Sequence, residues 1–179
     1  KLVVLHGGRI GVDSDVGQGA LFWFEIPLTA AKDQSLTRPT RDDGLTHEAL
    51  NILVVDDNPV NLMVAQLQLQ KTWPKAKITT VDTGLKALEL LANQAFDVAL
   101  IDMIMPDMDG MQVTQHIHQR FPGLVERMPI FALTANTNPV DRDRCLAAGM
   151  HEVLHKPMDM PVLKGTIGPY VRRAREGKL

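Results

Sequence analysis

The chain has 179 residues with a formal net charge of −2; 45% of the residues are hydrophobic and 22% are charged. This composition is typical of a globular protein with a packed core, and the charge argues against a nucleic-acid or anionic-membrane surface. The single cysteine, Cys145, excludes an internal disulfide framework and favours a reducing cytoplasm. No apolar run approaches the ~20 residues that span a bilayer, and no signal peptide opens the chain. Because the first residue is lysine, we interpret the sequence as a piece of a longer protein, whose upstream part could hold membrane segments.

Residues 1–28 show a β pattern interrupted by glycines that mark turns. Phe22, Phe24 and Ile26 occupy alternate positions, which predicts a strand. Residues 29–49 are polar and have no apolar period, so they are predicted to be a linker.

From residue 50 to residue 179, short apolar runs alternate with helical patterns. The predicted strands are 52–55, 78–81, 98–101, 129–133 and 152–154. Helices are predicted at 59–73, 84–92, 111–121, 139–149 and 160–174. Gly165, Gly168 and Pro169 are expected to weaken or kink the last one. The alternation predicts an α/β fold, a doubly wound parallel sheet of five strands with helices on both faces.

Polar residues follow or end four of these strands. They are Asp56, Asp57, Asp102, Thr134 and Lys156. Right-handed crossovers bring the carboxyl ends of parallel strands to one edge, where open α/β sheets bind ligands. Three carboxylates in one crevice repel one another, and a hard divalent cation relieves that repulsion. Oxygen ligands with few protein contacts suit Mg²⁺.

The same set of residues suits phosphoryl transfer, which depends mainly on in-line positioning and charge neutralisation. Asp102 is ionised at neutral pH, so it needs positioning rather than a base to act as a nucleophile. Lys156 supplies a positive charge for a phosphoryl oxygen, and Thr134 supplies a hydroxyl donor. A backbone carbonyl from the loop at 103–110 is a candidate further metal ligand.

Each of these residues also has a plain structural interpretation. The Asp56-Asp57 pair could be a solvated turn, and Asp102 a turn or helix-capping acid. Thr134 alone is most often a strand residue, and Lys156 alone a surface charge. Only their joint occurrence at strand ends favours a site. The six histidines are interpreted as surface or structural, because none has a partner at metal-ligand spacing.

Four stretches of the chain together resemble the receiver domain of two-component response regulators and hybrid sensor kinases. They are VVDDNPVN (54–61), LIDMIMPDMDG (100–110), ALTAN (132–136) and GMHEVLHKP (149–157). The resemblance covers residues 51–160 and implies a flavodoxin-like (βα)5 fold. It also implies that the domain takes a phosphoryl group from a phosphohistidine onto Asp102. The domain would then pass this group to a histidine-phosphotransfer partner or regulate the attached kinase.

The resemblance further implies a role for each site residue. The implied metal ligands for Mg²⁺ are Asp56, Asp57, Asp102 and the backbone carbonyl of Ile104. Thr134 and Lys156 would bind the phosphoryl group and report its presence. One position departs from the family pattern, because Val153 stands where many receivers carry an aromatic switch residue.

The stretch LHGGRIGVDSDVGQGALFWFEIPL at residues 5–28 resembles the end of a histidine-kinase ATP-binding domain. It lacks the asparagine-bearing helix and the Gly-rich lid that hold Mg–ATP, so we expect no ATP binding. Together the two resemblances imply the C-terminal part of a hybrid sensor histidine kinase, itself a histidine protein kinase. The expected partners are a phosphodonor histidine in the same parent chain and a histidine-phosphotransfer domain, without nucleic acid or membrane contact. An unpaired sheet edge in the truncated first segment could drive homodimerisation.

Two other functions remain open at the level of sequence. An aspartyl-phosphate phosphohydrolase would need a second acid two residues after the nucleophile, where Ile104 stands. A silent interaction domain would keep the fold without phosphorylation, which the full set of polar site residues disfavours.

Overall fold

The computed structural model describes most of the chain. The described residues are 2–5, 7–15, 17, 19–27, 45, 48–135 and 138–179. The chain divides into two compact units, residues 1–38 and residues 39–179. Most of the predicted linker at 29–49 lies outside the described residues, as do His6 and His47. Within the described part of the chain, no helix combines the length and the apolar character needed to cross a bilayer.

The first unit is an antiparallel hairpin preceded by one helical turn. Its elements are α1 (Leu2–Leu5), β1 (Arg9–Asp15) and β2 (Gly19–Glu25). Ile10 lies opposite Phe24, and Val12 lies opposite Phe22, so these four side chains share one face of the hairpin. All four are exposed. The predicted strand around Phe22 and Phe24 is confirmed as β2.

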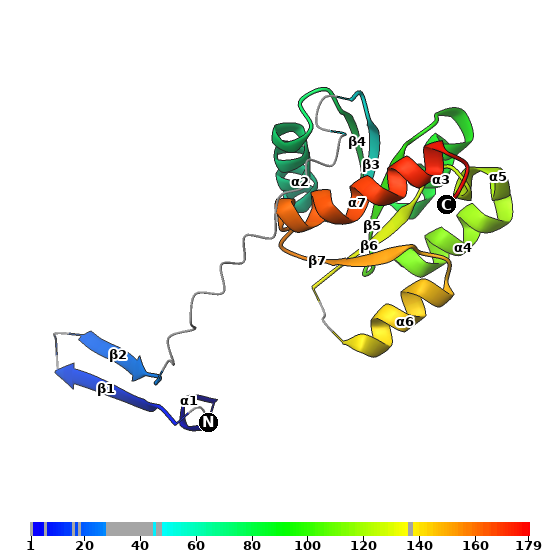
Figure 1. Ribbon diagram of the computed structural model, residues 1–179. Coiled ribbons are helices and arrows are strands. Elements are labelled where there is room, and N and C mark those ends of the chain that lie inside the picture. Colours follow the sequence, from blue (N-terminus) through cyan, green and yellow to red (C-terminus); the bar gives the residue numbers. More distant parts are fainter. Residues whose placement is uncertain are drawn as a thin grey trace. The chain divides into compact units, whose positions relative to one another are not determined.

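The second unit is built on a parallel sheet with the strand order β4-β3-β5-β6-β7 (Figure 1). The strands are β3 (Asn51–Val55), β4 (Lys77–Val81), β5 (Val98–Asp102), β6 (Ile130–Thr134) and β7 (Glu152–His155). Every residue of β5 and β6 is buried, as continuous apolar runs predict for central strands. The predicted doubly wound sheet is confirmed. Because strands are added on one side of β3 and then on the other, the crevice between β3 and β5 is the topological switch point.

Helices cover both faces of this sheet. They are α2 (Pro59–Thr72), α3 (Gly84–Asn93), α4 (Gly110–Arg120), α5 (Pro122–Val125), α6 (Pro139–Ala147) and α7 (Met160–Arg175). Helices α2 and α7 pack on one face around Trp73 and Phe131. Helices α3, α4 and α6 contribute to the core on the other face, around Ile117 and Ile101. The strand ends are therefore held between two buried apolar layers.

Side-chain caps fix where five of these helices begin. The capping residues are Asn58, Thr83, Asp109, Asn138 and Asp159. Each accepts a hydrogen bond from a backbone N–H in the first turn, which satisfies a donor that has no partner within the helix. These caps determine how the chain leaves the sheet edge after β3 and before α4.

One helix was missed in the sequence analysis, and the last helix lies where it was predicted. Helix α5 was not predicted, because four residues are too few to show a helical period. Helix α7 continues through Pro169 as one helix. Its residues Leu163, Ile167 and Val171 are buried in the core, and this packing outweighs the unfavourable proline.

The segment before β3 is fastened to the second unit by a buried leucine. Leu45, which falls within the predicted linker, is only 1% exposed. It belongs to the same buried cluster as Leu50, Trp73 and Val171. The folded unit therefore begins before residue 50.

An ion-pair cluster holds the same segment at the amino-terminal edge of the sheet. Arg175 near the end of α7 pairs with Glu48 and, at 3.0 Å, with Asp97. Asp97 precedes β5 and accepts a hydrogen bond at 2.8 Å from the backbone N–H of Asn51, the first residue of β3. The cluster thus joins the end of the chain, the start of β3 and the start of β5.

We predict that Leu45→Ala lowers the free energy of unfolding of the second unit by about 2 kcal/mol, because it removes buried methyl groups and leaves a cavity. Urea unfolding followed by far-ultraviolet circular dichroism measures this change. Leu67→Ala is the matched control, since Leu67 is 66% exposed on α2. It should change stability by less than about 0.5 kcal/mol. Equal effects of the two substitutions would show that Leu45 is not part of the core.

Candidate functional site

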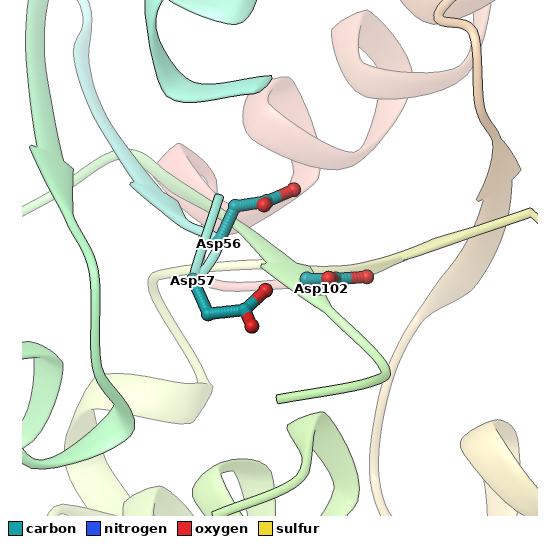
Figure 2. A group of neighbouring side chains, drawn as sticks. All are labelled: Asp56, Asp57 and Asp102. Carbon is teal, nitrogen blue, oxygen red and sulfur yellow. The ribbon is translucent and has the colours of Figure 1, made fainter. Parts of the chain in front are cut away.

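Three predicted acids converge at the carboxyl edge of the sheet. Asp56 and Asp57 follow β3, and Asp102 ends the neighbouring strand β5. Each contributes a carboxylate oxygen, and these oxygens all lie within 4.8 Å of one another (Figure 2). Asp56 and Asp102 are buried, whereas Asp57 is exposed. The acids therefore meet at the switch-point crevice, and their oxygen donors could hold a metal ion.

The ammonium of Lys156 lies between two of these carboxylates. Its Nζ is 2.6 Å from Oδ2 of Asp56 and 2.8 Å from Oδ1 of Asp102. Lys156 follows β7, and its backbone N–H donates to the carbonyl of Thr134 at 2.8 Å. The peptide bond from Lys156 to Pro157 is cis. A cation from the edge strand thus compensates two buried acids near the middle of the sheet.

Burial and pairing act in opposite directions on these charges. Burial raises the pKa of the Asp102 carboxyl, although the hydrogen bond and charge of Lys156 oppose that rise. Burial also acts to lower the pKa of Lys156, but the hydrogen bonds and charges of Asp102 and Asp56 outweigh it and leave the pKa raised. Lys156 therefore remains a cation at neutral pH.

Thr134 brings a hydroxyl to the same edge. It ends β6, one residue after Leu133, which is the β-sheet partner of Asp102. Its residue is 7% exposed and lines a cavity of about 360 Å³ together with Met103, Cys145 and Val153. Cys145 is buried. The cavity lies next to Asp102 along the chain and the sheet, because its lining residue Met103 follows Asp102 and its lining residue Thr134 follows the sheet partner of Asp102.

One site residue was not predicted from the sequence. Asn61 in α2 donates from Nδ2 to both carboxylate oxygens of Asp56, at 3.0 and 3.2 Å. The backbone N–H of Asn58 donates to Oδ1 of the same carboxylate at 2.9 Å. In the sequence, Asn61 ends the VVDDNPVN stretch at 54–61, but that stretch does not show which neighbour its side chain contacts.

The loop that follows Asp102 ends at Gly110, which lies close to the backbone of Asp102. A Cβ at Gly110 would lie 2.5 Å from the carbonyl oxygen of Asp102 and 3.2 Å from Cα of Met103. Only glycine permits this approach without a shift of the backbone. Asp109 forms a capping box with Gln112 at the start of α4. The helix is therefore set against the backbone that carries Asp102.

A family model described as the response regulator receiver domain matches residues 52–167. The chain belongs to this family. The match runs from β3 into α7, so it includes every strand end described above. The predicted family and the predicted fold of the receiver domain are both confirmed.

Curated relatives of the chain are sensor kinases. The chain is 40% identical over 168 residues to the sensor histidine kinase AruS of Pseudomonas aeruginosa, covering 94% of this chain and 16% of that protein. It is 33% identical over 167 residues to the aerobic respiration control sensor protein ArcB of Escherichia coli, covering 93% of this chain and 21% of that protein. The chain thus spans about a fifth or less of the length of these relatives.

Solved receiver domains share the structure of the second unit. The receiver domain of the sensor histidine kinase PA1611 from Pseudomonas aeruginosa is 35% identical, with a TM-score of 0.61. The similarity covers 69% of this chain and 98% of that one, which was solved with a magnesium ion coordinated in its active site cleft. The receiver domain DrrB activated with BeF3 is 24% identical with a TM-score of 0.57, which supports the fold alone.

We predict that Gly110→Ala lowers the free energy of unfolding by about 1–3 kcal/mol, because the added methyl group forces the backbone of Asp102 away from α4. Gly123→Ala is the matched control, since a Cβ at Gly123 in α5 would have no atom within 4 Å. That substitution should be neutral or stabilising by up to about 1 kcal/mol. Chemical denaturation measures both, and an equally harmless Gly110→Ala would contradict the close approach.

Proposed function

We propose that this receiver domain accepts a phosphoryl group from a phosphohistidine, with Asp102 as the acceptor. The observation that supports the proposal is the meeting of three carboxylates and one ammonium at a single sheet edge. Buried acids destabilise a protein unless other groups compensate their charge. Their concentration here favours a ligand that needs oxygen donors, a nucleophile and a positive charge together.

In the proposed reaction, a carboxylate oxygen of Asp102 attacks the phosphorus atom of the phosphohistidine. A P–O bond forms while the P–N bond breaks, and the electron pair of the broken bond goes to the donor imidazole nitrogen. No general base is required, because the carboxylate has no proton to lose. Lys156, already 2.8 Å from Asp102, neutralises charge on a phosphoryl oxygen. Thr134 offers its hydroxyl to another phosphoryl oxygen.

The acidic cluster fits Mg²⁺, because all of its donors are oxygen atoms. The residues that would hold it are Asp56, Asp57, Asp102 and, through its backbone carbonyl, Ile104. When bound, the ion would supply further charge neutralisation at the phosphoryl oxygens. Asp57 is exposed and can meet a cation that arrives from solvent. The magnesium-bound receiver of PA1611, at 35% identity, supports this choice of metal.

We also propose a place for this receiver in a longer protein. Residues 1–28 would end a histidine-kinase ATP-binding domain, residues 29–49 would connect the two domains, and residues 50–179 would form the receiver, against whose core Leu45 of the connecting segment already packs. The alignment with AruS covers 94% of this chain, so it extends well beyond the receiver match. The exposed apolar face of the hairpin suits an element that packs within a larger domain. The parent would be a cytoplasmic or membrane-anchored hybrid sensor histidine kinase that also supplies the phosphodonor.

Helix α2 carries an exposed apolar stripe that could bind a helix of the histidine-bearing partner protein. Val60, Met63, Val64 and Leu67 are between 45% and 66% exposed and have the spacing i, i+3, i+4, i+7. These residues share one face of the helix, and α2 starts directly after Asp57 and Asn58. We propose that this stripe receives an amphipathic helix of the histidine-bearing partner, which brings the histidine to the sheet edge.

Acetyl phosphate with Mg²⁺ should add one phosphoryl group to the chain, and Asp102→Asn should abolish the addition because the amide is not a nucleophile. Intact-mass spectrometry detects the product. Asp107→Asn is the control, since Asp107 is an exposed acid in the same loop. Modification that persists in Asp102→Asn at the level of the control would place the acceptor elsewhere.

Met63→Glu should slow phosphotransfer from a phosphorylated histidine-phosphotransfer protein by about tenfold or more, because a charge would be buried against the partner helix. Phosphorylation by acetyl phosphate should stay unchanged, since this small donor needs no docking surface. Leu85→Glu on α3 is the control, with Leu85 56% exposed but outside the stripe. Equal slowing with both donors would locate the defect in the site itself.

A further inference from the structure

Asp56 is the most completely buried acid of the site, and its carboxylate is held by several donors. The residue is 2% exposed. Its Oδ1 accepts from the backbone N–H of Asn58 at 2.9 Å and from Nδ2 of Asn61 at 3.0 Å. Its Oδ2 accepts from Nδ2 of Asn61 at 3.2 Å and from Nζ of Lys156 at 2.6 Å. Asn61 is therefore a neutral donor that contacts both oxygens, whereas the charged Lys156 contacts Oδ2.

Helix α2 presents these donors from a fixed position. Asn58 caps the helix by accepting a hydrogen bond from Val60 N, and Pro59 occupies the first helical position. Asn61 follows Asn58 by three residues, so both lie on the first turn. The turn cannot move far, because Ala65 and Leu69 on the same helix are buried in the core. The position of the Asn61 amide relative to β3 is therefore determined by the packing of α2 on the core and not by the charges of the site.

We infer that Asn61 is a positioning residue that fixes the orientation of the Asp56 carboxylate and, through it, the place of Lys156 between Asp56 and Asp102. The effect of Asn61 on the affinity of the site for a cation rests on the proposed function, whereas its effect on the Asp56 carboxylate does not. A carboxylate can turn about its terminal torsion, whose preference is broad and roughly two-fold. The amide of Asn61 removes that freedom because it contacts both oxygens.

The loss of this amide has a definite effect on the neighbouring charges. A buried carboxylate that loses a donor turns toward its remaining partners, the strongest of which is the Lys156 ammonium. Oδ1 then leaves the backbone N–H of Asn58, and a closer contact with Lys156 competes with cation binding. Asn61 therefore keeps Asp56 available to a metal ion, and because its amide is neutral it adds no charge to the site.

The test uses the 179-residue chain with Asn61→Leu, which keeps the side-chain size but removes the donor, and Asn61→Asp, which keeps the shape but replaces the amide with an acceptor. The first readout is hydrogen exchange of the Asn58 amide in metal-free buffer. The second is the affinity for Mg²⁺ alone, measured by calorimetry. Gln66→Leu is the matched control, because Gln66 is an exposed amide residue on the same helix.

We expect Asn61→Leu to speed exchange of the Asn58 amide by about threefold or more and to weaken Mg²⁺ binding by about 3- to 10-fold, in line with one hydrogen bond to a charged group. Asn61→Asp should speed exchange at least as much, because its second carboxylate repels Asp56. The control should change neither readout. The thermal midpoints of all variants are measured alongside, so that a general loss of stability is separated from the local effect.

Asn58 exchange and Mg²⁺ affinity that both match the wild-type chain in Asn61→Leu would overturn the inference. So would equal changes in Gln66→Leu. If the wild-type chain fails to bind Mg²⁺, the proposed function fails instead, and the exchange of the Asn58 amide in metal-free buffer still decides the role of Asn61. If Asn61→Leu does not fold, Asn61→Asp supplies both measurements.

Discussion

The site depends on the balance between two buried carboxylates and one ammonium. Asp56 and Asp102 are drawn together at the ends of adjacent strands, and their repulsion is compensated by Lys156, which reaches both. Removing either type of charge would leave the other buried without an opposite charge, which destabilises the fold. In the folded receiver the acids and the ammonium are already held together.

The parallel sheet supplies that arrangement over long distances in the chain. Lys156 and Asp56 are 100 residues apart in sequence, yet their side chains form a hydrogen bond. The two are brought together because every strand runs in the same direction and ends at the same edge. Buried apolar layers on both faces hold the strands in place. Phosphoryl transfer requires positioning more than acid–base chemistry, so a rigid sheet edge is a suitable support.

The strands and most helices could be predicted from the sequence because apolar runs mark strands and helical spacing of apolar residues marks helices. The acids could be predicted as a site only as a set, because they occur together at the ends of predicted strands. Features that arise only from tertiary packing were not predictable. Leu45 is one apolar residue in a polar stretch of the sequence, and its burial depends on a core cluster to which α2 and α7 also contribute. Asn61 acquires its role from the position of Asp56 on another element.

The attachment of the receiver has a consequence for how it would reach its partners. Leu45 and the contact of Glu48 with Arg175 fasten the incoming chain at the amino pole of the sheet, while the acids lie at the carboxyl pole. The point of attachment and the acids therefore lie at opposite ends of the strands. The number of residues ahead of Leu45 would then set the effective concentration of this edge near a tethered donor, without altering the chemistry performed there.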